Sequence, residues 1–122
     1  MLKVLLVEDS AVLAERISEI LTQIEGVEVV GTASDEATAV AFVKSARVDV
    51  LVLDLQLKHG TGFGVLRHLG VKRPVVVVMT NYALPEYRRR AKEMGVDYFL
   101  NKSLDYDQLP IVVKALQRAQ LD

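Results

Sequence analysis

The sequence predicts one α/β domain built on a doubly wound, five-stranded parallel sheet with five helices. Five apolar runs alternate with five helical patterns along the chain, and three of these runs are almost wholly apolar. Parallel strands that are buried on both faces have this composition, and alternating strands and helices are typical of parallel sheets. Right-handed crossovers favour the strand order 2-1-3-4-5, with strands numbered along the chain.

Length and composition limit the classes of protein that fit. The 122 residues suit a single domain, residues 1–122, and leave no room for two. A net charge of −1 gives no general attraction to nucleic acid or to anionic membranes. The chain has no cysteine and two histidines, which excludes disulfides and argues against a zinc site. Without a signal peptide or a membrane-spanning apolar run, we expect a cytoplasmic protein that contacts neither membrane nor nucleic acid directly.

The first strand and helix follow from an apolar run and a helical stripe. Residues 2–7 form the run, and residues 11–24 carry apolar side chains at helical spacing, namely Leu13, Ile17, Ile20, Leu21 and Ile24. We expect Ser10 to cap this helix and Gly26 to end it.

The second strand, residues 27–33, precedes a helix that we expect to run from a Ser34 cap to about residue 46. Asp35 and Glu36 are favourable in its first turn because they face the positive end of the helix dipole. Its predicted inward side chains are Ala37, Val40, Ala41 and Val43. Residues 50–53 form the third strand.

Glycines in residues 58–62 predict a loop, and residues 63–69 a short helix. The fourth strand is 75–79, and the helix 84–94 after it is expected to bury Leu84, Tyr87, Ala91 and Met94. The fifth strand is 96–100. The last helix is placed at 107–119, because Pro110 lacks an N–H and belongs in a first turn. Its inward side chains are Leu109, Val112, Val113 and Leu116.

Polar residues follow the strands that the predicted order places in the middle of the sheet. Glu8 and Asp9 follow the first strand, and Asp54 follows the third. The order reverses between these strands, and ligands bind at their carboxyl ends in such sheets. Three crowded carboxylates repel one another and need a cation, for which Mg²⁺ is suited to hard oxygen ligands. Thr80 and Lys102, after the fourth and fifth strands, would line the same pocket.

With these residues in place, the chain resembles response-regulator receiver domains, the phosphoryl-accepting part of two-component signalling, including the chemotaxis receivers. The resemblance covers essentially all 122 residues and rests on Glu8-Asp9, Asp54, Thr80 and Lys102 at their spacings. Residues 95–102 are similar to the fifth-strand signature of the family. Gly62, eight residues after Asp54, stands where the family usually carries glycine. The resemblance implies a flavodoxin-like fold.

The resemblance also implies roles for the site residues. Asp54 would accept a phosphoryl group from a sensor histidine kinase, a histidine phosphotransfer protein or an acyl phosphate. Mg²⁺ would be held by Asp54, by Asp9, by Glu8 mainly through water, and by the Gln56 backbone carbonyl. Lys102 would pair with Asp54 and then with the phosphoryl group. The chain would be no conventional enzyme, but would catalyse its own phosphorylation and the hydrolysis of its aspartyl phosphate.

Thr80 would donate a hydrogen bond to the phosphoryl group and act as a switch. Its inward movement would draw in Phe99 and reshape the surface made by helices 84–94 and 107–119 with strand 96–100. A partner would sense the phosphate through that surface, which also permits a homodimer.

The sequence departs from the family pattern at several positions. Glu8 replaces a usual aspartate, Phe99 a frequent tyrosine and Lys58 a common proline. Ser103 replaces the proline after the lysine, so we expect a trans Lys102–Ser103 bond. Asn81 is bulkier than usual, and we expect it to narrow access to Asp54.

Gln56 and Tyr82 stand where side chains border the attacking water. We expect the bulky Tyr82 to shield the anhydride and slow autodephosphorylation.

Each residue also has a simpler interpretation. Asp54 could cap the following loop, Glu8 and Asp9 could serve only the dipole of the next helix, and residues 88–90 are expected to be a solvated arginine face. Thr80 could be a plain strand residue, Lys102 a solvated charge and Phe99 plain core.

Two other functions compete with a phosphorylatable receiver. One is a receiver-like interaction module that takes no phosphate. The other is an enzyme on a similar sheet. A phosphohydrolase would need an Asp-x-Asp motif after the first strand, and a flavin protein would need a phosphate-binding loop there; residues 8–13 match neither. The sequence fits either a single-domain regulator or the receiver of a longer transcription factor. Of the possible roles, we favour regulation of gene expression or transfer within a phosphorelay.

Overall fold

Five parallel strands form one sheet in the order β2-β1-β3-β4-β5 in the computed structural model, which describes residues 1–71, 73–81 and 84–121. The strands are β1 (Leu2–Val7), β2 (Val27–Ala33), β3 (Val50–Leu53), β4 (Val75–Thr80) and β5 (Tyr98–Asn101). The helices are α1 (Ala11–Thr22), α2 (Glu36–Ser45), α3 (Gly62–Arg67), α4 (Pro85–Glu93) and α5 (Gln108–Leu121). The predicted fold class and strand order are confirmed.

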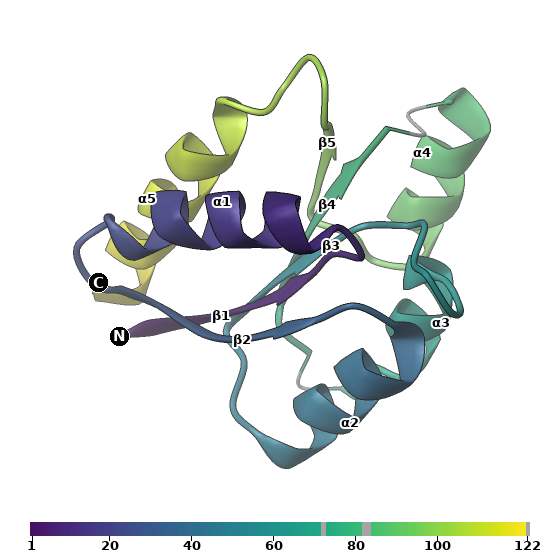
Figure 1. The fold of residues 1–122 in the computed structure, drawn as a ribbon, viewed down its shortest axis with the longest axis horizontal. Coiled ribbons are helices and arrows are strands. Elements are labelled where there is room, and N and C mark those ends of the chain that lie inside the picture. Colours follow the sequence, from purple (N-terminus) through teal and green to yellow (C-terminus); the bar gives the residue numbers. More distant parts are fainter. Residues whose placement is uncertain (72, 82–83, 122) are drawn as a thin grey trace.

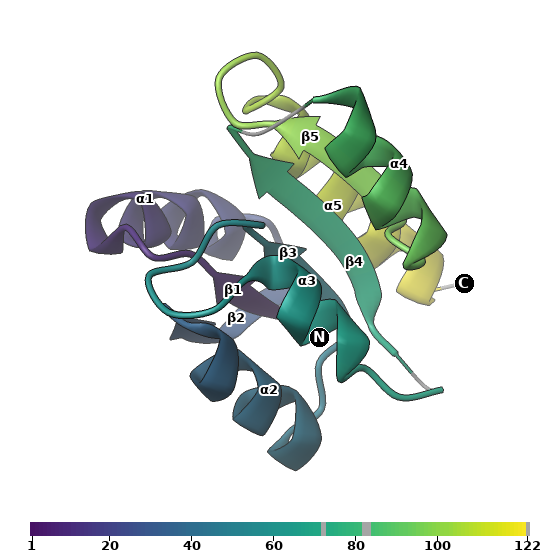
Figure 2. The ribbon, with the colours of Figure 1, turned by 90° about the vertical axis from the view of Figure 1, so that its right-hand side faces the viewer.

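Helices cover both faces of the sheet. In Figure 1, α1 and α5 lie together on one side, and Figure 2 shows α3 and α4 in front of the sheet with α5 behind it. Alternate residues of β1 serve the two cores: Val4 and Leu6 pack with α1 and α5, and Leu5 and Val7 pack with α2, α3 and α4. Burial on both faces explains why the central strands are almost wholly apolar.

The second helix differs from its prediction in its cap and its buried face. Asp35, not Ser34, is the N-cap, and its Oδ1 accepts a hydrogen bond from the Thr38 N–H at 2.7 Å. Ala37 and Ala41 are exposed, and Ala39 is buried instead. Alanine and valine line most of this helix, so its apolar stripe is weak, and the larger Phe42 and Val43 turn toward the core.

Two predictions in the second half of the chain are also wrong. Leu84, predicted to be buried, is the N-cap of α4 and is 52% exposed. The fifth strand begins at Tyr98 rather than at residue 96, because the Asp97 carboxylate accepts from the Val76 N–H at 2.8 Å in place of a backbone carbonyl.

The last helix follows the prediction, with Leu109 and Val113 buried and Pro110 in the first turn. Within the described ranges, no helix has the length and apolar character needed to cross a bilayer.

Candidate functional site

The two acidic strand ends meet at the carboxyl edge of β1 and β3. Val7 pairs with Leu53, and the Asp54 N–H donates to the Val7 carbonyl at 3.0 Å, so the residues that follow the two strands are neighbours. One carboxylate oxygen from each of Glu8, Asp9 and Asp54 lies within 4.8 Å of the other two. Glu8 and Asp54 are 4% and 6% exposed, whereas Asp9 is exposed.

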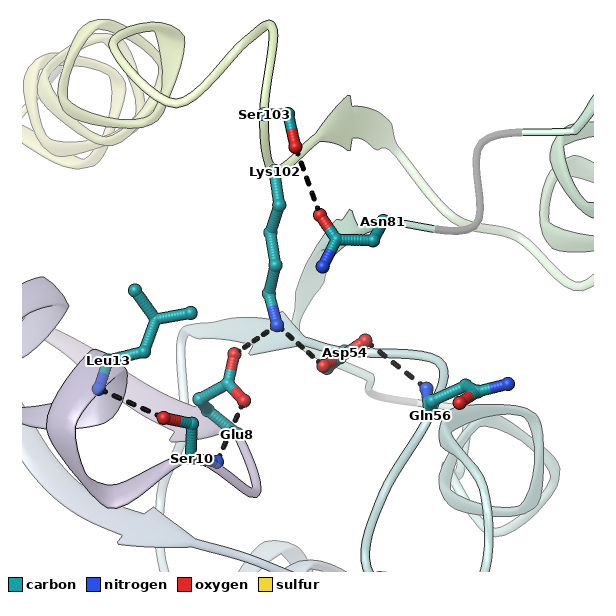
Figure 3. A network of polar contacts seen from close by, with 8 residues as sticks. All are labelled: Glu8, Ser10, Leu13, Asp54, Gln56, Asn81, Lys102 and Ser103. Carbon is teal, nitrogen blue, oxygen red and sulfur yellow. Dashed lines mark hydrogen bonds and ion pairs between the residues drawn. The ribbon is translucent and has the colours of Figure 1, made fainter.

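Lys102 places its ammonium between two of these carboxylates. Figure 3 shows the side chain descending from the end of β5, with Nζ 2.7 Å from Asp54 Oδ2 and in a second ion pair with Glu8. The backbone positions this side chain, because the Lys102 N–H donates to the Thr80 carbonyl at 3.0 Å. The contact with Asp54 is the one we predict in the absence of a phosphoryl group. The contact with Glu8 is additional.

The environment shifts two of these groups. Burial raises the pKa of the Glu8 carboxyl, and the hydrogen bond from Lys102 offsets this only in part. Burial acts to lower the pKa of Lys102, but hydrogen bonds to Asp54 and Glu8 outweigh it and raise the pKa above its ordinary value. Lys102 is therefore a stable counter-charge for the acids at neutral pH.

The loop after Asp54 folds back against its own strand. The Gln56 N–H donates to Asp54 Oδ1 at 3.2 Å, and Gln56 forms an isolated antiparallel bridge with Thr61. The Gly62 N–H then donates to the Leu55 carbonyl at 3.0 Å. A Cβ at Gly62 would collide with the Asp54 carbonyl oxygen, so this position needs glycine. Gln56 is thereby fixed two residues beyond Asp54.

The ends of β4 and β5 form the other side of the site. Thr80 is fully buried and pairs with Asn101 across the two strands. Ser103 Oγ donates to Asn81 Oδ1 at 3.3 Å, a bond that joins the two strand ends beside the Lys102 side chain (Figure 3). The described residues contain no cis peptide bond, so Lys102–Ser103 is trans, as predicted. Tyr82, predicted to shield the site, lies outside the described residues.

Phe99 and Tyr98 point to opposite sides of β5, as alternation along a strand requires. Phe99 is half-buried against the α2, α3 and α4 core, whereas Tyr98 is 38% exposed. The Arg88 guanidinium lies 4.7 Å from the centre of the Phe99 ring, and Arg90 lies 4.2 Å from that of Phe63. The arginines of residues 88–90 are exposed as predicted, but two of the three also cover aromatic rings.

The donor set suits a small divalent cation. Three carboxylate oxygens gather at one point, and hard oxygen ligands of this kind are preferred by Mg²⁺. Acids this close together need a counter-charge, which the Lys102 ammonium supplies here.

The structure thus brings Glu8, Asp9, Asp54 and Lys102 together, with Gln56 and Thr80 on the segments around them. Phe99 lies on β5, where its ring is covered from α4. The Glu8–Lys102 pair and the Asn81–Ser103 bond are not predicted from the sequence, because each depends on the orientation of side chains at the strand ends.

Comparison with known proteins agrees with this geometry. The response regulator receiver domain family matches residues 4–114 of the chain. A protein-glutamate methylesterase/protein-glutamine glutaminase of Methylobacillus flagellatus is 36% identical over 104 residues, which cover 83% of this chain and 29% of that protein. The transcriptional regulatory protein DesR of Bacillus subtilis is 26% identical, over 98% of this chain and 60% of its own length. The chain therefore spans less than two thirds of these relatives.

Solved structures share the fold. The REC domain of AraT, a response regulator from Geobacillus stearothermophilus, is 30% identical with a TM-score of 0.84, over 98% of this chain and 96% of that one. The response regulator domain of Thermotoga maritima CheB has the same TM-score at 23% identity, over 100% and 98% of the two chains. With the sheet order, the matched span and these relatives in agreement, the chain belongs to the response regulator receiver domain family.

Proposed function

We propose that Asp54 accepts a phosphoryl group and that residues 1–122 form a single receiver domain. An Asp54 carboxylate oxygen would bond to phosphorus as the bond between phosphorus and the donor imidazole nitrogen breaks. The imidazole would leave with the electron pair and take up a proton. The observation that carries the proposal is the position of Asp54, which faces two further acids and lies 2.7 Å from the Lys102 ammonium.

Glu8, Asp9, Asp54 and the Gln56 backbone carbonyl would hold Mg²⁺. When bound, the ion supplies positive charge that neutralises the phosphoryl oxygens. Lys102 would exchange its carboxylate partner for a phosphoryl oxygen. The Thr80 hydroxyl would donate to another. Since phosphoryl transfer depends mostly on positioning and charge neutralisation, these residues suffice for self-catalysed phosphorylation and for slower hydrolysis of the anhydride by water.

The output would be a shift between two conformations of the surface formed by α4, β5 and α5. Thr80 moving toward the phosphoryl group leaves space that Phe99 can fill, and phosphate drives the change only by binding one conformation better. We place this reaction in the cytoplasm, with a sensor histidine kinase or a histidine phosphotransfer protein as donor. The same surface would serve a downstream protein or a second copy of the chain, without direct contact to nucleic acid.

Acetyl phosphate tests the chemistry. Incubation with Mg²⁺ is expected to add the mass of one phosphoryl group to the intact protein. Omission of Mg²⁺ or the substitution Asp54→Asn is expected to abolish the adduct. A wild-type protein that stays unmodified under these conditions would refute the proposal.

A second candidate function is an interaction module that takes no phosphate. The Asn81–Ser103 hydrogen bond favours it, because it joins the two strand ends beside Lys102, and such a link would narrow the approach to Asp54. Beryllofluoride separates the two functions: a phosphoacceptor binds it with Mg²⁺ present, and a module of the second kind does not.

A further inference from the structure

The start of α2 is fastened to the loop that follows Asp54. The Glu36 N–H donates to the His59 carbonyl at 3.0 Å, and Glu36 Oε1 accepts from the Thr61 N–H at 3.0 Å. One residue of α2 therefore binds residues 59 and 61 through both its backbone and its side chain.

Two glycines make room for this side chain. A Cβ at Gly60 would lie 2.5 Å from Glu36 Cβ, and a Cβ at Gly64 would overlap Glu36 Oε1. Gly60 also has a φ of +86°, a conformation that other residues rarely adopt. The loop is thus shaped around Glu36 on both sides of Thr61.

Thr61 connects the Glu36 contacts to the segment that leads to the acidic site. It forms the antiparallel bridge with Gln56, and its Oγ1 accepts from the Gly64 N–H at 3.0 Å at the start of α3. Gln56 in turn donates its N–H to Asp54 Oδ1 at 3.2 Å. Lys58, in the middle of this loop, has no ring to fix its φ. The contacts of Glu36 therefore hold the segment between Gln56 and Thr61 from outside.

We propose that Glu36 is a positioning residue for the divalent-cation site: it holds Thr61, and through Thr61 it sets the position of the Gln56 backbone carbonyl. This inference rests on the proposed function, in which that carbonyl is a Mg²⁺ ligand. Glu36 acts through the reach of its side-chain oxygen rather than through its charge.

Two substitutions separate reach from charge. Glu36→Gln keeps an oxygen at the same distance along the side chain and loses the charge. Glu36→Asp keeps the charge and the favourable acid in the first turn of the helix, but is one methylene too short to meet the Thr61 N–H. Glu86→Asp, in the first turn of α4, is the matched control for the same shortening.

Titration with MgCl₂, followed by the backbone amide signals of residues 54–62, gives the dissociation constant. Supporting residues around metal ligands commonly change affinity about 10–100-fold, and we expect Glu36→Asp to weaken binding by about tenfold. Glu36→Gln and Glu86→Asp should stay near wild type. In metal-free protein, hydrogen exchange of the Thr61 amide should accelerate in Glu36→Asp and remain slow in Glu36→Gln.

The other outcomes are decisive as well. Weakening in Glu36→Gln, with or without weakening in Glu36→Asp, would show that the charge is needed, and an unchanged constant in both variants would show that the loop holds itself; either overturns the inference alone. A wild-type protein that binds no Mg²⁺ would overturn the proposed metal site and this inference together. Thermal unfolding of each variant establishes that it is folded.

Discussion

Removal of the Lys102 ammonium is expected to destabilise the metal-free protein strongly. The side chains of Lys102, Glu8 and Asp54 are 10%, 2% and 7% exposed, so Lys102→Met leaves two buried carboxylates facing each other. Breaking a buried ion pair by removing one partner costs about 3–5 kcal/mol. We expect the lower end of this range, because one carboxyl can take up a proton.

The expected loss can be measured as a shift in Tm. Unfolding entropy is about 2.1 cal/mol/K per residue, so for 122 residues a loss of 3 kcal/mol lowers Tm by roughly 12 °C. Methionine keeps most of the length and apolar stem of lysine. Lys114→Met, at an exposed position of α5, is the control for the loss of one positive charge. The loss in Lys102→Met should shrink as pH falls, because protonation removes the repulsion between the acids.

Mg²⁺ provides the complementary measurement. Lys102 competes with the cation for Glu8 and Asp54, so Mg²⁺ should bind Lys102→Met more tightly than wild type and raise its Tm by more. Equal melting temperatures for Lys102→Met and Lys114→Met would refute the stabilising role of the ion pairs. A larger Mg²⁺-induced rise in wild type would refute the competition.

Three further predictions concern the shifted acids and the ring on β5. Arg88→Gln removes a cation–π contact worth about 0.5–1 kcal/mol that stabilises the present position of the Phe99 ring beside α4, so beryllofluoride affinity should rise about two- to fivefold. An unchanged affinity means that Arg88 does not bias the switch. Asp35→Ala should lower Tm at pH 7. A hydrogen bond from the Thr38 N–H holds the pKa of Asp35 in the folded protein below its ordinary 3.8. The Asp35 carboxylate therefore stabilises the protein fully above pH 3.8, and this stabilisation is lost as the pH falls through the lower pKa of the folded state. A Tm difference between Asp35→Ala and wild type that persists in strong acid would contradict this. Burial raises the pKa of Glu8, so on acidification protons should displace Mg²⁺ from the Glu8 carboxylate at a higher pH than they would from an ordinary glutamate. Parallel pH profiles of Mg²⁺ affinity for wild type and Glu8→Gln would exclude this competition between protons and Mg²⁺.

The strands β1 and β3 and the grouping of the acids were predictable because one physical signal determines each. β3 is a continuous apolar run and β1 is apolar except for Lys3, both runs end at acidic residues, and both strands have the bounds predicted for them. Once the order 2-1-3-4-5 is adopted, the carboxyl ends of β1 and β3 must be adjacent. Glu8 and Asp54 then meet without any detail of side-chain conformation.

Other features depend on choices that local sequence leaves open. Ser34 and Asp35 can each cap a helix, and the structure has Asp35 as the cap, with Phe42 and Val43 of the same helix packed against the core. Likewise, Lys102 can reach either Asp54 or Glu8, and the position of the β5 end lets it reach both. Contacts such as that of Glu36 with Thr61 need the loop backbone to be known first.

The location of the phosphoryl adduct tests the central claim most directly. After reaction with acetyl phosphate, reduction with borohydride and peptide mass mapping identify the modified side chain. The account predicts modification at residue 54 alone and only when Mg²⁺ is present. An adduct on His59, His68 or another acid, or one that forms equally well without Mg²⁺, would contradict it.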